Sequence, residues 1–315
     1  MLLDWVYVAI GLVILLLAGD SLVKGAVNLS LRLGVPALIV SLTVVAFGTS
    51  APELLISVQA ILDGVPGLAL GNVVGSNTAN VLLVLGIPAL LAAMHTSEHN
   101  TKDSYLQMLA ATVLFIVLCF FGPLTWISGV ILLTALAGML IHAARAARAH
   151  RRADEGDADE VEGADPDMAW WKIIGFLVLG LVGLPIGASL LVDGSVNIAR
   201  GFGISETVIG LTLVAVGTSL PELATTVMAA LRRQADVALG NVIGSNMFNL
   251  LGIMGVAALV GTIPVDPQFL QFDLWVMLAC GLLLIPFVFL GRNITRVWGV
   301  ILTALYVAYL VLVLA

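Results

Sequence analysis

The residues best suited to chemistry form one short polar motif that occurs twice, each time inside an apolar stretch. Gly48–Glu53 reads G-T-S-A-P-E, and Gly217–Glu222 reads G-T-S-L-P-E. A charged carboxylate at the centre of a bilayer costs about 2.5–3.5 kcal/mol on insertion scales, so helix packing alone gives no reason to bury one there. Proline removes a backbone donor, and glycine loosens the same turn. Each motif therefore predicts a broken helix that presents carbonyls, two hydroxyls and one acid to a polar cavity.

The two motifs belong to an internal repeat whose copies lie 169 residues apart and align without a gap. An ungapped match of such special residues indicates that the chain consists of two copies of one structural unit. The same offset relates Gly25 to Gly194, Asn28 to Asn197, Gly34 to Gly203, Gly71-Asn72 to Gly240-Asn241, Gly75-Ser76-Asn77 to Gly244-Ser245-Asn246, and Asn80 to Asn249.

The motifs are rich in oxygen and contain neither thiol nor imidazole, which is typical of a site for a hard cation. Two copies would bring Glu53 and Glu222 together, and two close carboxylates cannot both stay ionised without a cation or a proton. Calcium neutralises both and takes roughly six to eight oxygen ligands. Sodium also takes oxygen ligands, so competition for one cavity is enough for exchange. The candidate ligands are the side chains of Glu53, Glu222, Ser50, Ser219, Ser76, Ser245, Asn80 and Asn249 and the carbonyls of Ala46, Thr49, Ala215 and Thr218.

The composition places these motifs in an all-α membrane protein. Of the 315 residues, 60% are hydrophobic and only 10% are charged, a balance that soluble domains do not show. The mean hydropathy is +1.11. We expect ten transmembrane helices, with helices 2 and 7 broken at the motifs and helix 3 interrupted at Gly71–Asn77. The expected spans are 3–31, 36–62, 66–93, 105–121, 124–144, 168–199, 205–231, 237–260, 272–290 and 294–314.

A charged segment separates the two halves. Eight of the 20 acidic residues lie between Asp154 and Asp167, after a basic patch at Arg145–Arg152, and without these eight the net charge of −7 would be +1. A run this polar predicts a disordered linker. The chain then divides into a first five-helix repeat at 1–147 with its motif region at 46–86, a linker at 148–168, and a second repeat at 169–315 with its motif region at 215–255.

The distribution of positive charge predicts the orientation. Twelve of the 13 Lys and Arg residues fall on or near the linker side of the expected membrane, and only Arg200 falls on the other side. Positive residues favour the cytoplasm, so we expect the 145–168 loop to be cytoplasmic and both termini to be outside. An odd number of spans in each repeat forces the two copies into opposite orientations, as in secondary transporters whose sites lie at the midplane.

Other polar and small residues in the spans have simpler interpretations. Asp20 and Lys24 are four residues apart and are expected to pair along one helix, with a role in transport as the alternative. Ser57, Thr226 and Gly11 are expected to pack helices together.

The sequence G-T-S-x-P-E followed by G-N-x-x-G-S-N-x-x-N, occurring in both halves, resembles the alpha-repeats of the calcium/cation antiporter superfamily. The nearest branch is similar to the prokaryotic sodium/calcium exchangers. This resemblance implies a non-enzymatic antiporter of a prokaryotic inner (plasma) membrane, without a cofactor, whose partners are calcium and sodium ions and the lipid bilayer; no protein partner or nucleic acid is indicated. It also implies that helices 2, 3, 7 and 8 hold the ions while helices 1 and 6 slide across them to alternate access.

The chain departs from some members of this superfamily. Some relatives have aspartate where this chain has Asn249, and neutral amides at Asn80 and Asn249 argue against potassium co-transport. Calcium/proton exchangers tend to have asparagine in place of Ser50 and Ser219, so calcium/proton antiport is the alternative, followed by a cation channel. An intramembrane enzyme would need a nucleophile or a metal cluster, and no histidine or cysteine lies near the motifs.

Overall fold

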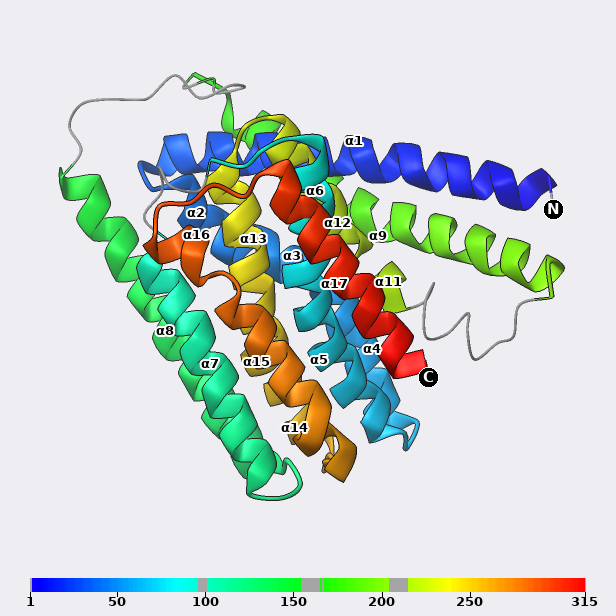
Figure 1. Cartoon of the computed structure of the whole chain (residues 1–315). Helices are drawn as coiled ribbons and strands as arrows, with labels where there is room; N and C mark the ends of the chain where they lie inside the picture. Colours follow the sequence, from blue (N-terminus) through cyan, green and yellow to red (C-terminus); the bar gives the residue numbers. More distant parts are fainter. Residues whose placement is uncertain (1, 96–100, 154–164, 166, 204–214, 315) are drawn as a thin grey trace.

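The computed structural model is built of helices (Figure 1). It describes residues 2–95, 101–153, 165, 167–203 and 215–314. Within these ranges, extended pairing is limited to two isolated bridges, Met94 with Ile294 and Leu124 with Ile263, each of which joins a connecting segment of the first half to one of the second. The expected all-helical class is confirmed.

The helices follow the expected spans closely in both halves. The first half contains α1 (Leu2–Leu33), α2 (Ala37–Val40), η1 (Ser41–Val45), α3 (Ala46–Thr49), α4 (Ala51–Leu62), α5 (Pro66–Leu82), α6 (Gly86–Leu91), α7 (Lys102–Phe120) and α8 (Trp126–Ala153). The second half contains α9 (Trp170–Gly201), α11 (Ala215–Thr218), α12 (Leu220–Leu231), α13 (Ala235–Met247), η4 (Phe248–Ile253), α14 (Met254–Val260), η5 (Phe269–Asp273), α15 (Leu274–Leu282), α16 (Ile285–Phe289) and α17 (Arg296–Leu314).

Helices α1 and α9 lie side by side along their length and cross the other helices at an angle (Figure 1). Glycines allow their backbones to approach closely: a Cβ atom on Gly11 would lie 2.6 Å from the backbone nitrogen of Leu191, and one on Gly25 would lie 2.9 Å from that of Leu177. Later residues of α1 contact earlier residues of α9, so the two helices are antiparallel. Gly11 therefore packs helices together, as expected.

Among the described residues, eight helices are long and apolar enough to cross a membrane, or nine if the bent pair Ala37–Thr49 and Ala51–Leu62 counts as one span. In each of the segments Pro66–Leu91 and Ala235–Val260, 83% of an 18-residue apolar stretch is buried inside the protein, so the two segments form its centre. The first part of the expected seventh span, 205–214, lies outside the described residues, and α11 and α12 are its remainder.

The two chain ends lie on the right-hand side of Figure 1, whereas α8 ends at the opposite, upper-left side, where the linker begins. We call these the termini side and the linker side. The fifth apolar span, Trp126–Ala146, ends within two residues of the expected position, whereas helix α8 itself continues through the basic patch to Ala153. Alanine and arginine both favour helix, so the helix extends beyond its apolar part.

The predicted helix breaks at the two motifs are present. Helix α3 ends at Thr49, Ser50 leaves helical geometry at φ −85° and ψ 6°, and α4 begins directly after it. The two segments on either side are bent by 43°. In the second half, Ser219 has nearly the same conformation, φ −89° and ψ 5°, between α11 and α12. Proline follows as the second residue of each new helix, a position where its missing N–H group has no intrahelical partner to lose.

The predicted interruption at Gly71–Asn77 is wrong. Helix α5 runs unbroken through this stretch and ends only at Leu82. The matching helix α13 is likewise continuous through its glycines, which serve close packing: a Cβ atom on Gly240 would lie 2.9 Å from the carbonyl oxygen of Leu38. Glycine here admits a neighbouring backbone and does not break the helix.

Candidate cation-binding site

The two predicted motifs meet in the interior of the protein. Glu53 and Glu222 are each 1% exposed. Each is the third residue of the helix that follows its break, α4 or α12. Ser50 of the first motif donates a hydrogen bond from Oγ to Oε1 of Glu222 in the second, at 3.1 Å. The two carboxyl groups are also close enough to interact electrostatically.

Several oxygens of this cluster are buried without a hydrogen-bond partner. Buried polar atoms in proteins are almost always paired, so a group of unpaired oxygens indicates a place for a ligand. First-turn N–H groups of α4 and α12 favour negative charge nearby but cannot neutralise two acids. In the described part of the chain, the unpartnered atoms of the predicted residues are both carboxylate oxygens of Glu53, Oε2 of Glu222, Oγ of Ser219 and Ser245, Oδ1 of Asn80, and both side-chain polar atoms of Asn249.

Thr49 and the carbonyl of Ala46, two further predicted ligands, already have hydrogen-bond partners within the protein. Thr49 donates from Oγ1 to the carbonyl of Ala46 and to Oδ1 of Asn241, at 3.3 Å each. The Ala46 carbonyl also accepts the N–H of Ser50 at 3.1 Å, so a cation would replace one of these donors. Ser76 is 4% exposed.

In the second motif, Thr218 lines a cavity beside α9. Ala215 begins α11, and its side chain is outside the described atoms.

An asparagine that sequence reasoning left out of the site orients two others. Asn246 accepts a hydrogen bond on Oδ1 from Nδ2 of Asn80 at 3.0 Å, and its backbone carbonyl accepts one from Nδ2 of Asn77 at 3.2 Å. Both donors are thereby used inside the protein, and the Oδ1 atoms of Asn77 and Asn80 stay buried without partners. Asn246 thus leaves two neutral oxygens available to a cation.

The same hydrogen bond occurs in both halves at a second pair of positions. Asn72 donates to Oγ of Ser57 at 3.3 Å, and Asn241 donates to Oγ1 of Thr226 at 3.1 Å. Asn241 also donates to the backbone carbonyl of Glu222 at 3.3 Å. Ser57 and Thr226 were expected only to pack helices. They also accept hydrogen bonds from the asparagines that support the motifs. The Gly-Asn pair that occurs in both repeats could have indicated this role from the sequence.

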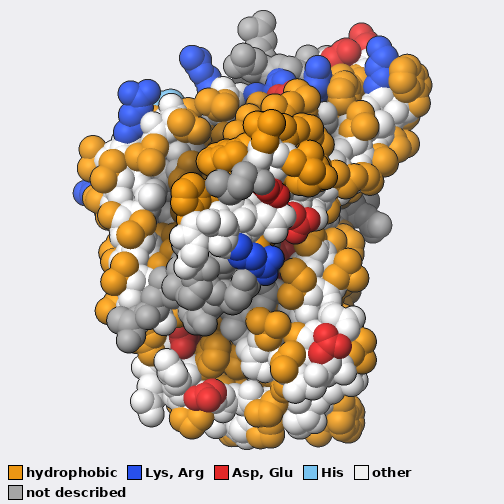
Figure 2. Space-filling view, turned by 90° about the vertical axis from the view of Figure 1, so that its right-hand side faces the viewer, with side chains coloured by type: hydrophobic (Ala, Val, Ile, Leu, Met, Phe, Trp, Pro, Cys, Tyr) orange, Lys and Arg blue, Asp and Glu red, His pale blue; other side chains and the backbone are white. Residues whose placement is uncertain are grey.

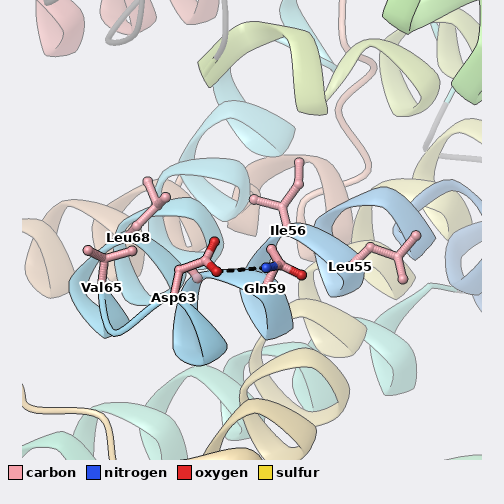
Figure 3. A pocket seen from close by; sticks show the side chains of 7 residues that line it. Leu55, Ile56, Gln59, Asp63, Val65 and Leu68 are labelled. Atoms are coloured by element: carbon pink, nitrogen blue, oxygen red, sulfur yellow. Dashed lines mark hydrogen bonds between the residues drawn. The ribbon is translucent and has the colours of Figure 1, made fainter.

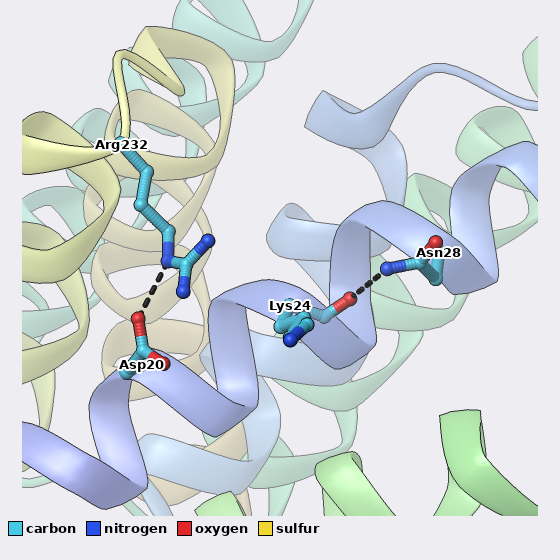
Figure 4. Close-up of polar contacts among 4 residues, drawn as sticks. All are labelled: Asp20, Lys24, Asn28 and Arg232. Atoms are coloured by element: carbon cyan, nitrogen blue, oxygen red, sulfur yellow. Dashed lines mark hydrogen bonds and ion pairs between the residues drawn. The ribbon is translucent and has the colours of Figure 1, made fainter. Parts of the chain in front are cut away.

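The expected pair between Asp20 and Lys24 is absent. Asp20 instead accepts a hydrogen bond on Oδ1 from Nε of Arg232 at 2.5 Å, which joins α1 to the end of α12 (Figure 4). Lys24 lies over the ring of Phe176 on α9, 5.0 Å from its centroid. Asp20 pairs with Arg232 and not with Lys24 because Arg232 lies at a helix end that faces α1, and because its planar guanidinium donors suit a carboxylate.

Two hollows lie near the motifs. One, of about 240 Å³, is bounded by the second motif at Gly217, Thr218 and Pro221, and by α9. The other, of about 450 Å³, lies over the end of α4, where Gln59 donates a hydrogen bond to Asp63 at 2.8 Å (Figure 3). Ile56 borders both hollows.

Two acid-bearing helix breaks in contact inside a helical membrane protein suit the binding of a cation within the membrane. The sequence model of the family described as sodium/calcium exchanger protein matches residues 3–144 and 172–315, and the chain belongs to this family. It is 37% identical over 350 residues to sodium/calcium exchanger MaX1 of Methanosarcina acetivorans, covering 98% of this chain and 97% of that protein. It is 33% identical over 285 residues to inner membrane protein YrbG of Escherichia coli, covering 90% and 88%.

A solved structure has the same fold. The sodium-calcium exchanger NCX_Mj, soaked with 2.5 mM Na+ and 1 mM Sr2+, matches with a TM-score of 0.84 and 32% identity over 99% of this chain and 98% of that one. The chain is therefore a membrane protein of an antiporter family that moves calcium and other cations.

Proposed function

We propose that this protein exchanges calcium for sodium across a prokaryotic plasma membrane by alternating access. The observation that carries the proposal is the pair Glu53 and Glu222. The two acids come from opposite halves of the chain, both are 1% exposed, and three of their four carboxylate oxygens have no partner. Two buried negative charges match the double charge of one calcium ion.

The neutral oxygens complete the proposed site. Hydroxyls of Ser50, Ser219, Ser76 and Ser245, amide oxygens of Asn80 and Asn249, and carbonyls of Ala46, Thr49, Ala215 and Thr218 would surround the carboxylates. A calcium ion would use both acids together. A sodium ion needs only one acid and neutral oxygens, so sodium ions in overlapping positions would displace calcium.

The proposed architecture is two inverted five-helix repeats, 1–147 and 169–315, with the linker at 148–168. The antiparallel packing of α1 against α9 supports it, since these are the first helices of the two repeats. The equivalent hydrogen bonds of Asn72 and Asn241 support it as well. The glycine-lined contact between α1 and α9 would let the pair move as one rigid body across α4 and α12.

The proposed orientation places the termini side outside and the linker side in the cytoplasm. Figure 2 views the protein from the right-hand side of Figure 1. Lys and Arg side chains gather along its upper edge, and the lower part of this face shows acidic side chains without visible Lys or Arg. Support for a cytoplasmic linker side comes from the sequence, in which twelve of the 13 Lys and Arg residues fall on or near that side, because positive residues are retained in the cytoplasm.

The test is calcium flux in proteoliposomes under an imposed sodium, potassium or proton gradient, each applied alone. The proposal requires that a sodium gradient drive calcium in the opposite direction. Flux that follows the proton gradient and ignores sodium would establish the calcium/proton alternative, and currents far above transporter turnover would establish a channel.

A further inference from the structure

The two halves differ in charge at three equivalent positions, and at two of them the charges are opposite. With the offset of 169 residues, Asp20 corresponds to Ser189, Lys24 to Asp193, and Asp63 to Arg232. The structure supports the last equivalence directly. Asp63 directly follows α4 and Arg232 directly follows α12, and the next residue in each case, Gly64 at φ 76° or Arg233 at φ 57°, has left-handed backbone geometry. The same turn is thus built twice with different side chains.

On the linker side, two of the three positions are paired with each other. Arg232 pairs with Asp20 between the end of α12 and α1, and Lys24 lies against α9 (Figure 4). One acid and two bases give this cluster a net charge of +1. A cation that approached here would meet an ion pair already made and an excess positive charge.

On the termini side, the same positions carry two acids and no base. Asp193 accepts a hydrogen bond from Ser189 at 3.2 Å, and Asp63 accepts one from Gln59 at 2.8 Å. Within the described residues, neither acid has an ion-pair partner. The net charge of this cluster is −2, three units more negative than that of its counterpart.

These acids border the two hollows near the second motif. Asp63 borders the 450 Å³ hollow at the end of α4 (Figure 3), and Asp193 borders the 240 Å³ hollow together with Thr218 and Pro221. Ile56 borders both, so the hollows are adjacent. Thr218 and Pro221 are the sequence neighbours of Ser219 and Glu222, which are both 1% exposed and carry unpartnered oxygens. The hollow that Asp193 borders is also bordered by both motifs, at Pro52 of the first and at Thr218 and Pro221 of the second.

We propose that Asp63 and Asp193 are cation-recruiting residues of the approach path on the termini side, and that the pair Asp20–Arg232 closes the equivalent path on the linker side. This inference rests on the proposed exchange. Negatively lined clefts raise the local concentration of cations. A divalent ion about 10 Å from one carboxylate in water is enriched about fourfold and a monovalent ion about twofold, by Coulomb's law. The protein is therefore expected to bind calcium with higher apparent affinity from the termini side.

The test is sided calcium uptake in proteoliposomes of known orientation, at low ionic strength, with the variants Asp193→Asn and Asp63→Asn. Each should raise KM for calcium on the termini side about fourfold and the half-saturating sodium concentration about twofold, with turnover at saturation unchanged. The KM for calcium on the linker side should not change. The effect should shrink when salt is raised to about 0.5 M, because the Debye length falls well below 10 Å.

Matched controls separate recruitment from structural damage. Asp266→Asn removes the same charge on the same side, from a residue that borders neither hollow, and keeps the oxygen that accepts the N–H of Gln268. It should leave KM unchanged, and Asp193→Glu should restore it. An unchanged KM in Asp193→Asn, an equal rise on both sides, or equal factors for calcium and sodium would refute the inference. A wild-type protein that exchanges no calcium would instead refute the proposed function.

Discussion

Replacing Glu53 or Glu222 by glutamine tests the central site most directly. Glutamine keeps the size of the side chain and one oxygen but removes a charge. Because both residues are 1% exposed, the calcium ion at this site would have exchanged its water for protein oxygens. Removing one partner of a buried charge pair costs about 3–5 kcal/mol. The affinity for calcium should therefore fall by at least about 100-fold in either variant.

The same change has an opposite effect on the protein without calcium. Two buried carboxylates that interact with each other destabilise the cation-free state. Glu53→Gln should therefore raise the melting temperature in a calcium-free buffer and abolish the increase that calcium gives to the wild type. A higher melting temperature without calcium, together with no further increase when calcium is added, would show that the variant has lost a calcium ligand and not its fold.

The measurement is calcium titration by calorimetry, together with flux and thermal unfolding, on both purified variants, with gel filtration to verify their folded state. The repeat adds a further demand: the two variants should fail to a similar degree although they lie in different halves. If one variant kept near-normal calcium affinity, the hypothesis of a shared calcium site would be wrong, and the two acids would have different roles.

Three further predictions concern the surroundings of the site. Asn246→Leu removes the side-chain oxygen that holds the amide of Asn80 and keeps the backbone carbonyl that holds Asn77, so the affinities for both ions should fall about 10- to 100-fold, as for other residues that orient a metal's ligands, while gel filtration stays normal. Replacing 154–164 by a Gly/Ser segment of equal length should leave exchange unchanged, because these residues lie outside both repeats; a folded variant without flux would contradict this. Exchange should also be insensitive to membrane potential, measured with potassium diffusion potentials.

The main features of the fold follow from local signals in the sequence. Proline and glycine around Ser50 and Ser219 placed the helix breaks correctly, because their backbone constraints act within one turn. Apolar stretches gave the described spans to within a few residues, but they did not give the end of α8, where helix propensity and not hydropathy decides how far the helix continues. The contact between the two motifs followed from the repeat, since equivalent units with buried acids have reason to meet.

Contacts between distant segments could not be read in the same way. Asp20 and Arg232 are 212 residues apart, and the nearer Lys24 offered a plausible local partner. The asparagines of the G-N-x-x-G-S-N repeat posed a related problem, because their spacing does not say which amides face an ion and which hold a neighbour. The partners of Asn246 and Asn241 come from other helices, so only the folded arrangement separates these roles.

The insensitivity to membrane potential follows from the charge of the site. Among the buried side chains of the described residues, Glu53 and Glu222 are the only acids, and the amides of Asn80 and Asn249 are neutral. A site of charge −2 is balanced by one calcium ion or by two sodium ions, whereas a third sodium would leave a buried positive charge without a partner. Exchange of one calcium for two sodium ions moves no net charge. An exchange that moved one charge would shift the calcium accumulation ratio about 50-fold per 100 mV, and such a shift would show that the acids do not determine how many ions bind.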